Sequence, residues 1–205
     1  PWNTDMGYFQ FFTKYTGVRQ LYYESSQDGI HWTEDKMLAA IPVNKGEKSG
    51  HYQTSNMFNN KVVGTFFNRH PNGNVDQRTD LYYVQSADFG KTWTAVDGTR
   101  IDVPILDKDS PTRAVDYASK GKNVYLKDMG FDQEGRPICL YIRSNGHEPG
   151  PVSSPYEWCI SKWEDQQWKT FVVTDSDHNY DMGSLFILED NWKIVGPTEK
   201  GPQTW

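Results

Sequence analysis

The chain has 205 residues, 15% of them aromatic, and a formal net charge of −6 at pH 7. This acidic balance argues against general nucleic-acid binding, which needs a basic face, and no stretch approaches the run of about 20 apolar residues that spans a bilayer. We therefore expect no nucleic-acid partner and no membrane span, and a chain rich in strands, because aromatic residues favour them.

The first predicted group of strands covers residues 1–45. Three strands are expected, at 8–15, 19–25 and 32–40, and an inner strand is either missing or supplied by residues before Gly7. A turn motif joins the last two strands, with the sequence Ser26-Gln27-Asp28-Gly29-Ile30-His31-Trp32. Because the chain begins at Pro1 and ends at Trp205 soon after a predicted strand, we expect the natural protein to extend further.

The second group covers residues 46–98 and contains the clearest motif. Its strands are expected at 51–58, 61–68, 80–86 and 92–96, with Asn59-Asn60 as a turn. The run from Ser86 to Trp93 fills the pattern Ser-x-Asp-x-Gly-x-Thr-Trp. Asp88 can accept bonds from backbone amides, Gly90 can take a positive φ, and Trp93 can bury its ring between neighbouring sheets. The motif therefore indicates a fold rather than a reaction.

Two further groups complete the chain, at 118–174 and 175–205. Strands are expected at 123–131, 137–143, 157–163, 168–173, 180–188 and 192–197, while 103–119 is expected to be a long irregular connection. A register centred on Pro149 would place Cys139 opposite Cys159. That leaves a cross-strand disulfide or two buried thiols, and we favour the thiols because direct cross-strand bridges are geometrically demanding.

The two turn motifs resemble the Asp-box, or BNR repeat, of sialidase-like β-propellers. This resemblance implies an all-β fold, a propeller of four-stranded antiparallel blades with about three and a half blades present, as part of a larger propeller. The segments from Asn68 to Asn74, from Asp80 to Tyr83 and from Asp177 to Ser184 look like bacterial BNR-4 repeat proteins. Sialidases themselves are a poorer match, because neither their Phe-Arg-Ile-Pro-like segment nor an evident arginine triad is found.

That group is similar to ulvan lyases and to rhamnose-glucuronate lyases and hydrolases, whose sites use His, Tyr and Arg. It implies a secreted or periplasmic protein that acts on an acidic glycan. In a propeller, the loops between the second and third strands and the connections between blades share one face. This sorting predicts catalytic residues His51, Tyr52, His178, Tyr180 and Asp181, and substrate-binding residues Arg69, His70, Arg78, Arg143 and His147.

The residue types suit β-elimination at a uronic acid. Arginine can bind a carboxylate bidentately, histidine can take a proton and tyrosine can protonate a leaving oxygen. Lys127 and Asp128 are secondary candidates on an inner strand, where one of them must point into a blade interface or pair with its neighbour. Each of these side chains also has a purely structural interpretation, such as capping a strand or packing between blades.

Two other functions stay open. A glycoside hydrolase would use carboxylates such as Asp177, Asp181 or Glu148, and a glycan-binding propeller would stack sugar rings on its Tyr and Trp side chains. No cofactor and no catalytic metal site is expected, because the histidines have no tight ligand spacing, and a structural calcium ion stays open. Open strand edges would favour self-association.

Overall fold

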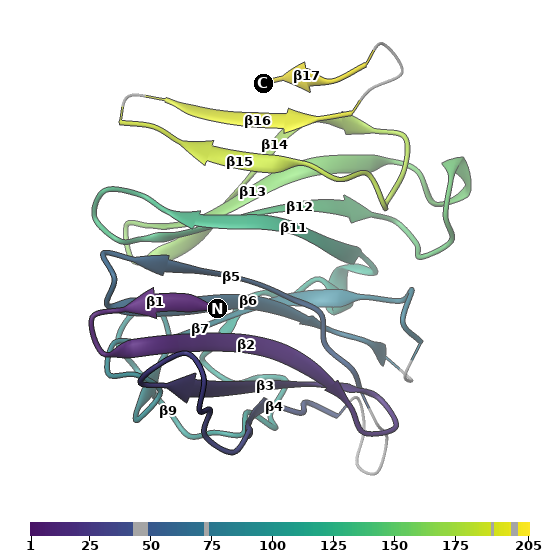
Figure 1. Cartoon of the computed structure of the whole chain (residues 1–205). Coiled ribbons are helices and arrows are strands. Elements are labelled where there is room, and N and C mark those ends of the chain that lie inside the picture. Colours follow the sequence, from purple (N-terminus) through teal and green to yellow (C-terminus); the bar gives the residue numbers. More distant parts are fainter. Residues whose placement is uncertain (43–48, 72–73, 190, 198–200) are drawn as a thin grey trace.

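The structure is a computed structural model that describes residues 1–42, 49–71, 74–189, 191–197 and 201–205. Its strands form four antiparallel sheets that follow one another along the chain, as the colours in Figure 1 show. The predicted all-β class and the succession of antiparallel sheets are confirmed, and the first and third sheets have the predicted four strands. The expected boundary at 45/46, residues Asn72 and Gly73 of the family-like segment, and Asp190 of an expected turn lie outside the described residues.

The first sheet has the strand order β1-β2-β3-β4. Its strands are β1 (Trp2–Thr4), β2 (Gly7–Tyr15), β3 (Arg19–Ser26) and β4 (Lys36–Ala39). The inner strand that the sequence left open is β1, which pairs with the start of β2 through a short turn. Gly7 has a φ of +122°, and a Cβ there would lie 2.5 Å from the Ser26 carbonyl oxygen, so this turn requires glycine.

The second sheet is the largest, with the order β5-β6-β7-β8-β9 and β10 added on β7. Its strands are β5 (Gln53–Phe58), β6 (Val62–Arg69), β7 (Thr79–Ser86), β8 (Trp93–Thr94), β9 (Arg100–Ile101) and β10 (Arg113–Val115). The connection expected to be irregular therefore carries β10, and also the short 3-10 helix η2 (Ala118–Lys120). Ile105 in the same connection donates to the Leu38 carbonyl at 2.8 Å, which ties the second sheet to the edge of the first.

The third sheet has the order β11-β12-β13-β14. It comprises β11 (Asn123–Phe131), β12 (Pro137–Ser144), β13 (Tyr156–Glu164) and β14 (Gln167–Ser176), with the 3-10 helix η3 (Pro151–Ser153) before β13. The predicted cysteine register is wrong by two residues, because Cys139 lies opposite Ser161 and Cys159 opposite Tyr141. The loop that contains η3 sets this register. Both thiols are free and buried, as favoured from the sequence.

The fourth sheet has the order β15-β16-β17. Its strands are β15 (Ser184–Ile187), β16 (Trp192–Gly196) and β17 (Gln203–Thr204). β15 is shorter than the strand expected at 180–188, because the residues before Ser184 form a turn and an irregular approach to the sheet. β17 was not predicted from the sequence.

Apolar clusters fill the spaces between successive sheets. The cluster between the first and second sheets includes Trp93 of the second Asp-box, which is 2% exposed. The Trp93 ring packs edge-on against Tyr23 of the first sheet at a centroid distance of 4.9 Å and contacts Phe11 at 5.9 Å. The expectation that this ring is buried between neighbouring sheets is confirmed, and the motif therefore joins two sheets.

Candidate functional site

The candidate site is a cluster of side chains around Arg78, in the loop between β6 and β7. That loop lies on the side of the molecule that carries the other loops between second and third strands and the connections between sheets, to the right in Figure 1. The Arg78 guanidinium carbon lies 4.2 Å from the ring centroid of Tyr52 and 5.2 Å from those of Tyr125 and Tyr180. Three aromatic faces therefore surround one cation, an attractive arrangement that also limits the positions of the guanidinium.

Arg78 remains available to a ligand. Its Nε donates to the Val75 carbonyl at 2.8 Å, and no ion pair to Arg78 is found within the described part of the chain. The sequence left Asp76 and Asp80 open as structural partners of Arg78. Instead, Asp80 binds Arg69, and Asp76 accepts hydrogen bonds from tyrosines. A half-buried arginine whose Nη atoms have no hydrogen-bond partner among the described residues matches a carboxylate ligand.

The three tyrosines come from different parts of the fold and differ in their hydroxyl partners. Tyr125, on β11, donates to the Asp76 carbonyl at 2.8 Å, and Tyr180, before β15, donates to the Asp76 carboxylate. Burial, followed by this bond to Asp76, raises the pKa of Tyr180. Tyr52 has no hydroxyl hydrogen bond to any described residue. Of the two tyrosines predicted to be catalytic, Tyr52 is therefore the one whose hydroxyl has no hydrogen-bond partner in the part of the chain that the structure describes.

Lys127 joins the cluster from an irregularity in the β11–β12 pairing, where the register shifts between Leu126 and Asp128. Its Nζ donates to the Asn179 carbonyl at 2.8 Å. Burial, and to a lesser extent repulsion from Arg78, lower the pKa of Lys127 to about 7, and attraction to Asp181 opposes both. A substantial fraction of Lys127 is therefore a neutral amine near neutral pH, which is the form that can accept a proton.

Asp128 takes the other position that the sequence predicted for one of these two residues, an interface between sheets. Its Oδ2 accepts from the Leu185 amide of the neighbouring sheet at 2.8 Å, so this side chain points into the interface between sheets.

His178 lies close to the tyrosines, with its ring 5.7 Å from that of Tyr180. Its Nδ1 accepts from the Tyr180 backbone amide at 3.1 Å, and the neutral ring therefore carries its proton on Nε2. In this tautomer Nε2 can donate a hydrogen bond but cannot accept a proton. Asp181 accepts from the Ser176 hydroxyl at 2.7 Å and acts on Lys127 through its charge.

Four of the predicted site residues have structural contacts instead of the open positions expected for them. His51 is fully buried, donates from Nδ1 to the Asn68 carbonyl at 2.7 Å and accepts from the Ile41 amide at Nε2. Burial lowers its pKa to about 4. Both ring nitrogens are thus used, and the predicted role of His51 as a base has no free atom to perform it.

Arg69 and Arg143 are each paired with a carboxylate rather than free for substrate. Arg69 donates to buried Asp80 at 2.6 Å, and Arg143 donates to Glu157 from both Nε and Nη2. His70 is 1% exposed, and burial lowers its pKa to about 3. Its ring packs 4.7 Å from that of Tyr52, which suits a positioning role rather than contact with a ligand.

His147 is half-buried in the loop between β12 and β13, where its carbonyl accepts from the Asn179 amide at 3.5 Å. The structure therefore brings together Arg78, Tyr52, Tyr180, His178 and Asp181 from the predicted set. Sequence reasoning missed Tyr125, Asp76 and Asn179. The position of Tyr125, two residues before Lys127 on an inner strand, was the available signal, because alternate residues of a strand share a face.

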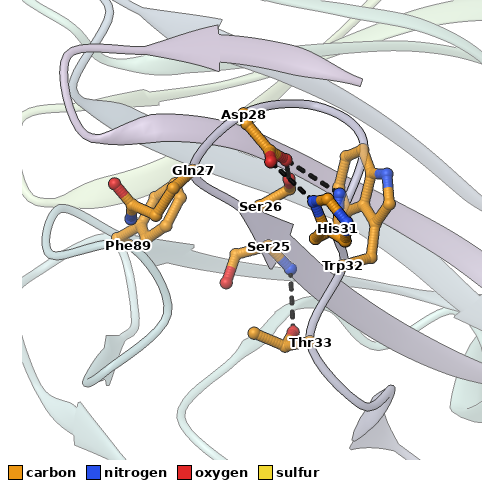
Figure 2. A pocket seen from close by; sticks show the side chains of 8 residues that line it. All are labelled: Ser25, Ser26, Gln27, Asp28, His31, Trp32, Thr33 and Phe89. Atoms are coloured by element: carbon orange, nitrogen blue, oxygen red, sulfur yellow. Dashed lines mark hydrogen bonds and ion pairs between the residues drawn. The ribbon is translucent and has the colours of Figure 1, made fainter.

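The opposite side of the molecule has a hollow of about 300 Å³ beside the first Asp-box. Figure 2 shows Asp28 turned toward His31 within this turn. The Asp28 Oδ1 accepts from the amides of Ile30 and His31 at 2.8 Å each, and Oδ2 contacts the His31 Nδ1 at 2.7 Å. These contacts lower the pKa of Asp28, the bond to the His31 side chain most of all. Both carboxylate oxygens serve the turn, as the motif predicts.

Within the described residues, no group of three or more His, Cys, Asp or Glu side chains converges as a metal site would require. No helix in this part of the chain has the length and apolar character needed to cross a membrane.

Comparison with known proteins gives similar solved structures and one family. A polysaccharide lyase of family PL25, an ulvan lyase, matches with a TM-score of 0.73 and 14% identity, over 92% of this chain and 46% of that one. The PL25 ulvan lyase bound to -[GlcA(1-4)Rha3S]- matches with a TM-score of 0.72 and 13% identity, over the same shares. The chain thus spans less than half the length of these structures, and at this identity the likeness concerns the fold.

No curated protein matches the chain. The family match is extensive, because it covers residues 18–176, which include both Asp-boxes, Arg78 and Lys127. The chain belongs to the family described as BNR repeat-containing family member.

Proposed function

We propose that this chain is part of a carbohydrate-active enzyme that cleaves a uronic-acid-containing glycan by β-elimination. The observation that carries the proposal is the Arg78 guanidinium, which has no carboxylate partner among the described residues and is held between three tyrosine rings. A uronate supplies the missing carboxylate. Likeness in fold to an ulvan lyase, which has been solved with a GlcA-containing ligand, supports the same substrate class.

The reaction requires one base and one acid. The base removes the C5 proton of the uronate, the C4–C5 double bond forms, and the electron pair of the C4–O bond leaves with the glycosidic oxygen, which takes a proton from the acid. Arg78 would neutralise the carboxylate and so make the C5 proton more acidic. This electrostatic stabilisation of developing charge is commonly a large part of the rate enhancement.

Lys127 is the base that the geometry favours. His51 has both nitrogens occupied and His178 uses Nδ1 as an acceptor, whereas Lys127 lies in the charge field of Arg78 with a pKa of about 7. Tyr52 is the acid that fits best, because its ring contacts Arg78 and its hydroxyl has no described protein partner. His178 Nε2 would donate a hydrogen bond to the glycan. Such residues contribute on the order of 10²–10⁴-fold each to rate.

The experiment is to incubate the full-length protein with a panel of uronate polymers and to follow the ultraviolet absorbance of the unsaturated uronide. Arg78→Lys retains the charge but loses the bidentate geometry, and we expect it to reduce kcat/KM by roughly 10²-fold or more. Arg100→Lys, at an exposed residue of β9, is the matched control and should retain activity.

Other products would identify another function. New reducing ends without the absorbance change would indicate hydrolysis, and tight binding without any product would indicate a glycan-binding propeller. Either result would refute the lyase proposal.

A further inference from the structure

Arg19 places a second guanidinium beside the Tyr52 ring, in addition to that of Arg78. Arg19 is the first residue of β3 in the first sheet, whereas Arg78 lies in a loop of the second sheet. The Arg19 guanidinium carbon lies 5.5 Å from the Tyr52 ring centroid, compared with 4.2 Å for that of Arg78. Two cations from different sheets therefore lie within cation–π distance of one tyrosine ring.

The backbone of Arg19 is held against the residues that precede β5. Its carbonyl accepts from the amide of His51, the residue before Tyr52, at 2.7 Å. Gly50 permits this approach, because a Cβ there would lie 3.3 Å from the Arg19 nitrogen and 2.9 Å from the His70 Nδ1. The start of β3 is therefore packed directly beside Tyr52.

The positive charge next to Tyr52 comes from arginines. Neither Arg19 nor Arg78 forms an ion pair with a carboxylate in the residue ranges that the structure describes. The His70 ring packs 4.7 Å from that of Tyr52, but burial lowers the pKa of His70 to about 3, and repulsion from nearby cations, Arg78 and Arg19 among them, contributes to the decrease. His70 is therefore neutral near pH 7 and adds no charge.

Substrate binding would affect the two arginines differently. Under the proposed function, the uronate carboxylate pairs with Arg78 and compensates its charge. The Arg19 guanidinium then remains as an uncompensated cation next to Tyr52. Such a charge stabilises the phenolate that forms when Tyr52 gives up its proton, because opposite charges attract more strongly near a protein surface than in bulk water.

We propose that Arg19 is a positioning residue that acts through Tyr52 and favours the transfer of its proton to the departing glycosidic oxygen. In that step the C4–O bond breaks, its electron pair stays on the oxygen, and the phenolic proton moves to that oxygen. Tyr52 becomes a phenolate and regains a proton from water, and Lys127 releases the C5 proton to water. This inference rests on the proposed function and adds a residue of the first sheet to the site.

The test compares two substrates that share the uronate and differ in the group on its C4 oxygen. One carries a sugar and the other a 4-nitrophenyl group, which leaves as nitrophenolate and needs no acid. For Arg19→Gln, we expect kcat on the sugar-bearing substrate to fall about tenfold with little change in KM, as the loss of one charge near a protein surface predicts. Both constants for the nitrophenyl substrate should match those of the wild type.

Three further variants serve as controls. Arg19→Lys keeps the positive charge and should retain most of the wild-type kcat, which separates a charge effect from a packing defect. Tyr52→Phe removes the acid but keeps the ring, and adding Arg19→Gln to it should have no further effect, because the two residues act as a unit. Arg100→Gln makes the same charge change at an exposed residue of β9 and should behave as the wild type does.

The outcomes separate the two proposals. If Arg19→Gln slows both substrates equally, changes only KM, changes neither constant or adds its full effect to that of Tyr52→Phe, the role of Arg19 is refuted while elimination at Arg78 stands. If the wild type produces an unsaturated uronide from neither substrate, the proposed function fails and the role of Arg19 fails with it.

Discussion

Replacement of Lys127 by methionine tests the electrostatics of the candidate site, independently of any substrate. A pKa that falls from 10.5 to about 7 on folding corresponds to about 5 kcal/mol in favour of the neutral amine. Between these two pKa values the unfolded chain binds a proton that the folded protein does not, so unfolding takes up a proton and stability rises with pH. Below pH 7 both states are protonated and the folded state bears the full cost.

The magnitude follows from the same linkage. From about pH 7.5 to 9.5, the free energy of unfolding of the wild type should increase relative to Lys127→Met by up to about 2.5 kcal/mol. Partial solvent exposure of the amine makes this an upper value. Urea unfolding of both proteins at several pH values measures the difference, and all titrations that the two proteins share cancel in it. A difference that is independent of pH would refute a depressed pKa at Lys127.

Turnover gives a second readout at the same residue. If neutral Lys127 is the base, kcat/KM rises with pH to a plateau with a midpoint near 7. Asp181→Asn removes the charge that favours the ammonium form, so the midpoint should move to lower pH. A midpoint that stays in place in Asp181→Asn would exclude Lys127 as the titrating group.

Three further predictions concern stability and accessibility. Asp80→Asn keeps the shape of a residue at φ +59° but leaves the buried Arg69 without an anion, and we expect a loss of about 3–5 kcal/mol by urea unfolding. A loss of less than about 1 kcal/mol in the free energy of unfolding would contradict a solvent-excluded ion pair between Arg69 and Asp80. Gly90→Ala places a Cβ 2.8 Å from Tyr23 Cε2 at φ +77°, so it should lower the melting temperature, in contrast to Gly98→Ala, where open space leaves only the cost of a positive φ. Burial raises the pKa of Cys139 and Cys159, so both thiols should react with a chromogenic disulfide reagent only after unfolding; rapid reaction of the native protein would contradict this.

Strand positions could be predicted from the sequence wherever the residues of the connecting turn determine its backbone conformation. Asn59 and Asn60 have φ values of +47° and +55°, and the turn between β13 and β14 has two consecutive residues with positive φ, Asp165 and Gln166. Such turns are typical of two-residue hairpins, and local chemistry determines them. The added strand β10 has no such signal, because it is stabilised by pairing with β7, which is distant in sequence, and the short strand β17 pairs with β16 at only two positions.

The candidate site was harder to predict, because its members are brought together by packing. The sorting of loops to one face grouped Tyr52, Arg78 and Tyr180, and in the structure the Arg78 guanidinium carbon lies 4.2 Å from the Tyr52 ring centroid and 5.2 Å from that of Tyr180. It could not distinguish His51 from these, since the Ile41 amide that donates to its Nε2 comes from the connection after β4, outside the sheet of His51's neighbours. Proximity to a face follows from topology, whereas the partner of each polar atom depends on packing between sheets.

Lys127 and Asp128 are neighbours in β11, at a register shift, and their side chains have different surroundings. A regular strand points neighbouring side chains to opposite faces, and the sequence therefore required Lys127 and Asp128 to diverge. At the register shift, Asp128 accepts from the Leu185 amide of the next sheet, whereas Lys127 donates to the Asn179 carbonyl. Because such bulges occur preferentially near functional sites, where they redirect a side chain, the same deviation supports the proposal that Lys127 is the base.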